Sequence, residues 1–191
     1  MEVSFYCKYP KTPHTALNLY RKGVLPGSVE RPKVSKLSVS DISKPVRPYF
    51  KSICRFDDVY VTLLRLVMFS SVRGFGADDL TLTYHFHAGK HLGYELIKKG
   101  IVKTLDDLFP VLAKYRIGLV DVVKESANTM VLDVYECVSC SGLPNIGKPV
   151  CYFESSIISA ILEKIMYRNK VKETKCWALG DTKCTFVVEF T

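Results

Sequence analysis

The sequence predicts an α+β fold, in which an antiparallel sheet packs against helices. Helical apolar spacing occupies the middle of the chain, and two runs rich in β-branched residues follow it. A long apolar helix and a final pair of strands complete the order. Strands grouped apart from helices, rather than alternating with them, are typical of antiparallel α+β domains. At 191 residues the chain has room for one full domain.

The first helix is expected from Asp57, and the glycine-containing stretch 73–76 ends it. Apolar residues recur there at three- and four-residue steps and predict the buried face. These are Val59, Leu63, Leu66 and Val67.

The next two segments also carry helical signals. Segment 80–97 is apolar and contains Gly89 and Gly93, which allow a close approach to another element or a ligand. A helix over 104–114 begins with Thr104 as N-cap and has two aspartates in its first turn, where the helix dipole favours negative charge.

Strands are predicted in two pairs. Runs 118–123 and 130–135 are rich in valine and are separated by turn-forming residues. A long helix then begins at Pro149, since proline suits the first helical position. Strands 171–177 and 183–190 form a closing hairpin around Leu179-Gly180-Asp181.

The N-terminal 50 residues form a basic arm. Residues 1–55 hold eleven Lys and Arg against three Asp and Glu, so the net charge of +8 resides there. Six of the nine prolines also lie in the first 50 residues, which disfavours long helices and central strands. We expect an extended arm with strand-like pieces such as 36–39. It packs on the domain at 51–191 or on a partner subunit; charge alone is weak evidence for nucleic acid.

Cysteines are concentrated near the end of the chain. Five of the seven lie within the last 55 residues. Neither a secretory signal nor an apolar run long enough for a membrane span is apparent, so we expect a reducing cytoplasm. There, such a cluster indicates metal ligands or redox-active thiols before disulfides, although single cysteines also serve as small core residues.

Three of these cysteines can share one ion. Cys176 and Cys184 stand opposite each other across the predicted hairpin, and Cys151 lies at the start of the long helix, where a thiolate is favoured. The fourth ligand is open between two residues. Glu173 needs a bulge to face the same side as Cys176, whereas Cys140 of the Cys137-x-x-Cys140 motif is the chemical substitute.

Residues 80–191 resemble the 4-vinyl reductase domain. The resemblance rests on three motifs: Cys140-Ser-Gly-Leu-Pro, then Gly147-Lys-Pro-Val-Cys151-Tyr-Phe-Glu, then Glu173-x-x-Cys176-x-x-x-Gly180-x-x-x-Cys184-x-Phe186. It implies a zinc ion held by Cys151, Glu173, Cys176 and Cys184. It also implies a dimeric module that binds a small hydrophobic molecule, with a fold shared with a subunit of the vesicle-tethering transport particle. The family commonly has a glycine where this chain has Ser155-Ser156, which affects the shape of the pocket.

Other motifs are weaker. His87 and His91 are four residues apart and can form a polar anchor in an apolar pocket, although surface or packing histidines explain them equally simply. No dinucleotide fingerprint, P-loop or G-x-S-x-G occurs, so a self-sufficient reductase is not expected. The sequence therefore predicts a ligand sensor or carrier with a structural zinc. The alternatives are a thiol-based redox sensor and an accessory protein of tetrapyrrole reduction.

Overall fold

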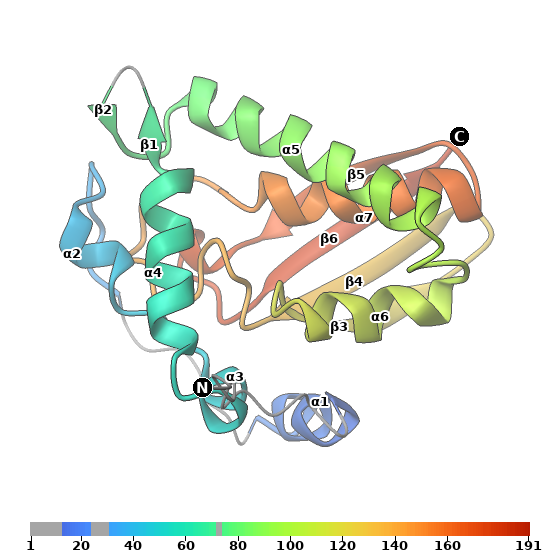
Figure 1. Cartoon of the computed structure of the whole chain (residues 1–191), viewed down its shortest axis with the longest axis horizontal. Helices are drawn as coiled ribbons and strands as arrows, with labels where there is room; N and C mark the ends of the chain where they lie inside the picture. Colours follow the sequence, from blue (N-terminus) through green and yellow to red (C-terminus); the bar gives the residue numbers. More distant parts are fainter. Residues whose placement is uncertain (1–12, 24–30, 72–73) are drawn as a thin grey trace, which may run out of the picture.

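The computed structural model describes residues 13–23, 31–71 and 74–191, and it confirms an α+β fold with one main antiparallel sheet (Figure 1). The helices are α1 (Pro13–Arg21), α2 (Val39–Ile42), α3 (Pro48–Ile53), α4 (Asp57–Met68), α5 (Asp79–Lys98), α6 (Leu105–Lys114), α7 (Tyr152–Ile165) and the 3₁₀ turn η1 (Trp177–Leu179). The strands are β1 (Ser70–Ser71), β2 (Gly74–Phe75), β3 (Leu119–Glu125), β4 (Thr129–Tyr135), β5 (Asn169–Lys175) and β6 (Cys184–Phe190).

The four long strands form an antiparallel sheet in the order β3-β4-β6-β5. Both predicted strand pairs are confirmed, and β6 joins them by pairing with β4. Met130, Leu132, Phe186 and Val188 are completely buried on the face that forms the core. Between Glu173 and Lys175 the β5–β6 register shifts by one residue. This is the bulge that Glu173 requires in order to share a face with Cys176.

Helices α5 and α7 pack side by side along the sheet (Figure 1). The two glycines of α5 face α7 directly. A Cβ atom on Gly89 would lie 2.3 Å from the carbonyl oxygen of Phe153, and one on Gly93 would lie 2.9 Å from that of Ile157. The expected close approach at both glycines is confirmed. Segment 80–97 is thus a single helix that touches the backbone of α7.

Helix α4 buries the face opposite to the predicted one. Val59, Leu63 and Val67 are 53–73% exposed, whereas Val61 and Arg65 are buried. The reason is that α4 docks on a polar loop rather than on the sheet. The guanidinium of Arg65 donates hydrogen bonds to carbonyl oxygens of that loop, a contact that hydrophobic periodicity does not detect.

The described part of the N-terminal segment is helical rather than extended, so the strand expected at 36–39 is wrong. Ser38 and Asp41 form a capping box that starts α2 at Val39. Proline does not oppose α1 or α3, because each helix starts with it. Residues 31–46 run against the loop that follows β4: the Val46 N–H donates to the Ser141 carbonyl oxygen at 3.2 Å. The division of the chain into 1–50 and 51–191 stays a prediction.

Helix α6 begins after Thr104, whose capping box with Asp107 confirms the expected N-cap. The start of α7 differs, since the helix begins at Tyr152 and Cys151 is its N-cap rather than part of its first turn. The backbone N–H of Cys151 instead donates to the carboxylate of Glu173 at 3.1 Å. In the part of the chain that the structure describes, no helix is long and apolar enough to cross a membrane.

Candidate metal centre and adjoining cavity

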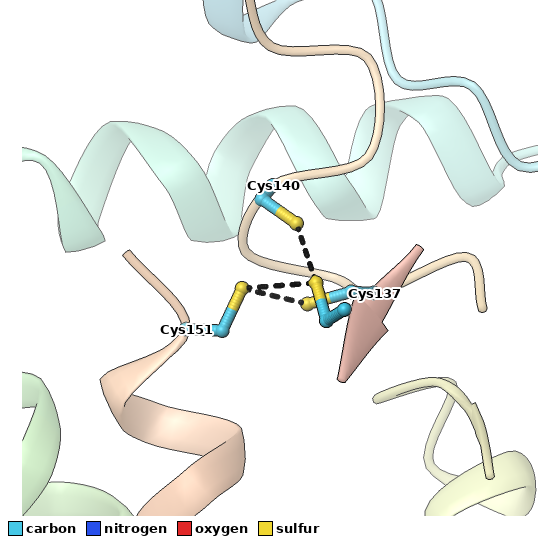
Figure 2. Close-up of side chains that lie close together, drawn as sticks. Cys137, Cys140 and Cys151 are labelled. Atoms are coloured by element: carbon cyan, nitrogen blue, oxygen red, sulfur yellow. Dashed lines mark hydrogen bonds between the residues drawn. The ribbon is translucent and has the colours of Figure 1, made fainter. Parts of the chain in front are cut away.

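Five cysteines from four segments meet in the interior of the protein. Cys137 and Cys140 come from the loop after β4, Cys151 caps α7, Cys176 follows β5, and Cys184 begins β6. All five are at most 1% exposed and none forms a disulfide. Figure 2 shows the side chains of Cys137, Cys140 and Cys151 turned toward one another.

The predicted ligand set is brought together. One ligand atom from each of Cys151, Glu173, Cys176 and Cys184 lies within 4.8 Å of every other. The Sγ atom of Cys151 is 3.7 Å from that of Cys176 and 3.5 Å from that of Cys184. Strand pairing places the two hairpin cysteines at the same level, and the bulge rotates Glu173 toward them. Their assignment as metal ligands stays a prediction.

A second set of four lies beside the first and shares two of its members. Cys137, Cys140, Cys151 and Cys184 also place their sulfur atoms within 4.8 Å of one another. Cys137 Sγ lies 3.3 Å from Cys151 Sγ, and Cys140 Sγ lies 3.2 Å from Cys184 Sγ. The sequence predicts Cys140 only as a replacement for Glu173. The C-x-x-C spacing is the signal that both cysteines of the loop join the cluster.

The donor atoms suit a divalent cation. Zn–S bonds of about 2.3 Å place the sulfurs of a tetrahedron about 3.8 Å apart, close to the contacts measured between Cys151 and the hairpin cysteines. Glu173 Oε1 is buried and has no hydrogen-bond partner among the described residues. Burial, together with the neighbouring Cys176, raises the pKa of Glu173 to about 10. An ionised carboxylate is therefore unfavourable there unless a cation is bound beside it.

The thiols show the same need for a cation. Burial raises the pKa of Cys151 and of Cys184 well above that of a free thiol. Without a metal these groups are neutral thiols, whereas a bound divalent ion converts its ligands to thiolates. These side chains can hold a metal ion.

Two buried charged residues support the Cys137–Cys140 loop. Arg65 of α4 donates from Nε to the Val138 carbonyl oxygen and from Nη2 to that of Ser141, each at 2.8 Å. Glu154 of α7 accepts hydrogen bonds from the backbone N–H and the hydroxyl of Ser139 and contacts Cys137 Sγ at 3.0 Å. Neither residue is predicted from the sequence, because nothing in the local pattern marks an arginine or a glutamate as buried.

The predicted ligand-binding histidines lie elsewhere. His87 and His91 are exposed on α5, on the side away from Gly89, and neither lines the cavity described next. Their neighbour His85 is buried against the carbonyl oxygen of Met68. The assignment of His87 and His91 to a ligand site stays a prediction.

An apolar cavity of about 480 Å³ adjoins the cysteine cluster. Leu92 and Leu96 of α5 form one wall, with Ile117 before β3 opposite. Val138, which lies between Cys137 and Cys140, and Phe153, two residues after Cys151, complete the apolar lining. Charged groups enter through Glu95 and Lys99. Loop and helix start therefore contribute cysteines to the cluster and side chains to the cavity.

The chain is similar to proteins of known family. The family model of the 4-vinyl reductase domain matches residues 130–190. An uncharacterised protein of Methanocaldococcus jannaschii, MJ1642, is 34% identical over 133 residues, covering 69% of this chain and 78% of that protein.

Two solved structures are also similar. A vinyl-4-reductase family protein from Methanocaldococcus jannaschii is 20% identical with a TM-score of 0.48, covering 70% of this chain and 80% of that one. A trafficking protein particle complex subunit 3 from Naegleria fowleri is 17% identical with a TM-score of 0.48, covering 71% and 97%. The motifs around Cys151, Glu173, Cys176 and Cys184, the family match over β4 to β6 and the extent of the MJ1642 relationship lead to one conclusion: the chain belongs to the 4-vinyl reductase domain family.

Proposed function

We propose that this protein is a sensor or carrier domain that binds a small hydrophobic molecule and is stabilised by a structural zinc ion. The observation that carries the proposal is the position of Val138. This residue lines the apolar cavity and lies between two cysteines of the metal centre. Occupancy of the centre by a metal therefore determines the shape of one cavity wall.

The cavity has the properties of a small-molecule site. Its volume lies in the range of about 300–1,000 Å³ typical of ligand pockets, and its lining is mostly aliphatic and aromatic. Its walls come from α5, α7 and the loop after β4, which are packed elements rather than loose chain ends. Burial of an apolar ligand contributes roughly 25 cal/mol per Å² removed from water, so a ligand of cavity size has a substantial driving force.

Zinc is the metal that these donors favour. Thiolates joined by one carboxylate suit a borderline-soft ion, and four protein ligands with no open position are typical of structural rather than catalytic zinc. When bound, the ion supplies folding free energy by linking the loop or the start of α7 to the β5–β6 hairpin. Its ligands must be reduced thiols, which suits a cytoplasmic location.

The sulfur pairs also allow a second function, in which oxidation forms disulfides and releases the metal. The Cys137–Cys151 and Cys140–Cys184 contacts of 3.3 and 3.2 Å favour it. Burial opposes it, because redox-sensing thiols are usually accessible to the oxidant. Zinc release by dilute peroxide within minutes, with thiol loss, would support the sensor; inertness until a chelator is added supports the structural role.

We further propose that the protein forms a homodimer through the exposed apolar face of α4. Val59, Leu63 and Val67 lie on this face, and Phe56 beside its start is 48% exposed. Contiguous exposed apolar groups of this kind mark interaction surfaces. Light scattering should give twice the chain mass for the wild type and the single-chain mass for Leu63→Glu; a monomeric wild type would contradict the assignment.

The cavity is tested by filling it. Leu92→Trp adds a bulky ring between α5 and Phe153, so we expect binding of the apolar probe 1-anilinonaphthalene-8-sulfonate to weaken at least about tenfold, equivalent to about 1.4 kcal/mol. The measurement is a fluorescence titration of the zinc-loaded protein. Leu80→Trp on the same helix is the matched control, because Leu80 is 45% exposed and does not line the cavity. Equal probe affinity in the wild type and Leu92→Trp would contradict the proposed site.

A further inference from the structure

We propose that the cysteine cluster is a binuclear metal centre, in which Cys137 and Cys140 bind a second divalent ion and Cys151 and Cys184 bridge the two ions. This inference rests on the metal centre proposed above and extends it to residues outside the predicted ligand set. The first ion takes Cys151, Glu173, Cys176 and Cys184, and the second takes the four cysteines 137, 140, 151 and 184.

The two ligand sets meet along one edge. Cys151 and Cys184 belong to both, and their sulfur atoms are 3.5 Å apart. On the hairpin side, Cys176 Sγ lies 3.7 Å from Cys151 Sγ. On the loop side, the sulfurs of Cys137 and Cys140 lie 3.3 Å from Cys151 and 3.2 Å from Cys184. Two four-ligand sites that share an edge of two thiolates account for all of these contacts.

A single ion leaves part of the cluster unexplained. One tetrahedral site uses four of the six donors, so two donors remain beside thiolates in an interior that water does not reach. If the ion takes Glu173 and Cys176, the two left over are Cys137 and Cys140. If it takes the four-cysteine set, the buried Glu173 Oε1 keeps no partner among the described residues. Two ions use every donor.

The loop that carries Cys137 and Cys140 is held as a ligand loop requires. Arg65 binds the carbonyl oxygens of Val138 and Ser141 and brings a positive charge next to the cluster, which offsets part of the negative charge of the thiolates. Glu154 bridges Ser139 and Cys137. Such outer contacts orient ligands and are typical of metal sites. Ordinary core cysteines need no buried arginine to place their loop.

The test is the number of ions bound per chain. The full-length protein, reduced, stripped with a chelator and reloaded with zinc alone, is measured by native mass spectrometry and elemental analysis. We expect two zinc ions per chain in the wild type and one in Cys137→Ser/Cys140→Ser. Ser141→Ala, in the same loop, is the matched control and should keep two ions, because Arg65 binds its backbone oxygen, which the substitution preserves.

A second measurement does not depend on any variant. X-ray absorption of the fully loaded wild type should show metal–metal scattering, because bridging thiolates hold the two ions in adjacent sites. Saturation at one zinc ion, or two ions without that scattering, would overturn the binuclear centre and leave the single structural zinc standing. Iron with acid-labile sulfide would also overturn it. Failure to bind zinc at all would remove both proposals.

Discussion

Replacing Cys184 is expected to produce the largest loss of stability. Cys184 belongs to both four-residue ligand sets, so neither set keeps four ligands without it. Structural zinc binding is itself folding free energy, and we expect Cys184→Ser to lower the free energy of unfolding by at least about 3 kcal/mol. Chemical denaturation of zinc-loaded protein, with zinc content measured in parallel, tests this.

Two controls separate metal loss from a packing defect. Cys184→Ala introduces no buried hydroxyl, so it should show the metal effect without the cost of an unpaired polar group. A chelator should destabilise the wild type by a similar amount and leave both variants almost unchanged. Cys176→Ser should behave like Cys184→Ser. A wild-type melting temperature in both serine variants would rule out a structural metal at the hairpin.

The second large effect is expected where α5 meets α7. A Cβ on Gly89 would lie 2.1 Å from Ser156 Oγ and 2.3 Å from the Phe153 carbonyl oxygen. The hydroxyl can rotate away, but the carbonyl belongs to the helix backbone, so the two helices must separate. Such overpacking costs about 3 kcal/mol, against a gain of about 1 kcal/mol in helix propensity. Gly89→Ala should therefore lose about 2 kcal/mol of stability in denaturant unfolding.

A graded series makes the helix contact testable. Gly93→Ala should cost less than Gly89→Ala, because its nearest contacts are 2.7 Å from Ala160 Cβ and 2.9 Å from the Ile157 oxygen. Ser156→Gly should rescue Gly89→Ala only in part, since the carbonyl contact remains. Equal or greater stability of Gly89→Ala would mean that the helices are not in this close contact.

Part of the candidate site followed from the chain alone. Cys176 and Cys184 flank a short turn, so hairpin geometry places them together whatever surrounds them. The need for a bulge at Glu173 follows from the alternation of side chains along a strand, and the structure contains that bulge. Local rules succeeded here because the relevant distances are set within one hairpin.

Other features depended on distant contacts. The apolar pattern of α4 predicted the wrong buried face, because Arg65 is satisfied by carbonyl oxygens more than seventy residues away along the chain. The predicted start of α7 at Pro149 was also wrong, because the Cys151 N–H bonds to Glu173 in a later strand. Patterns within one segment carry no information about such partners.

The amino-acid sequence by itself determined the α+β class, the strand pairs and the hairpin half of the cluster. Each depends on short-range geometry: apolar periodicity, turn residues and capping side chains. Only the tertiary structure decided that Cys137 and Cys140 join Cys151 and Cys184, and that Val138 faces a cavity beside them. Those contacts bring together segments separated in the chain, and their geometry is set by packing that acts on the whole domain at once.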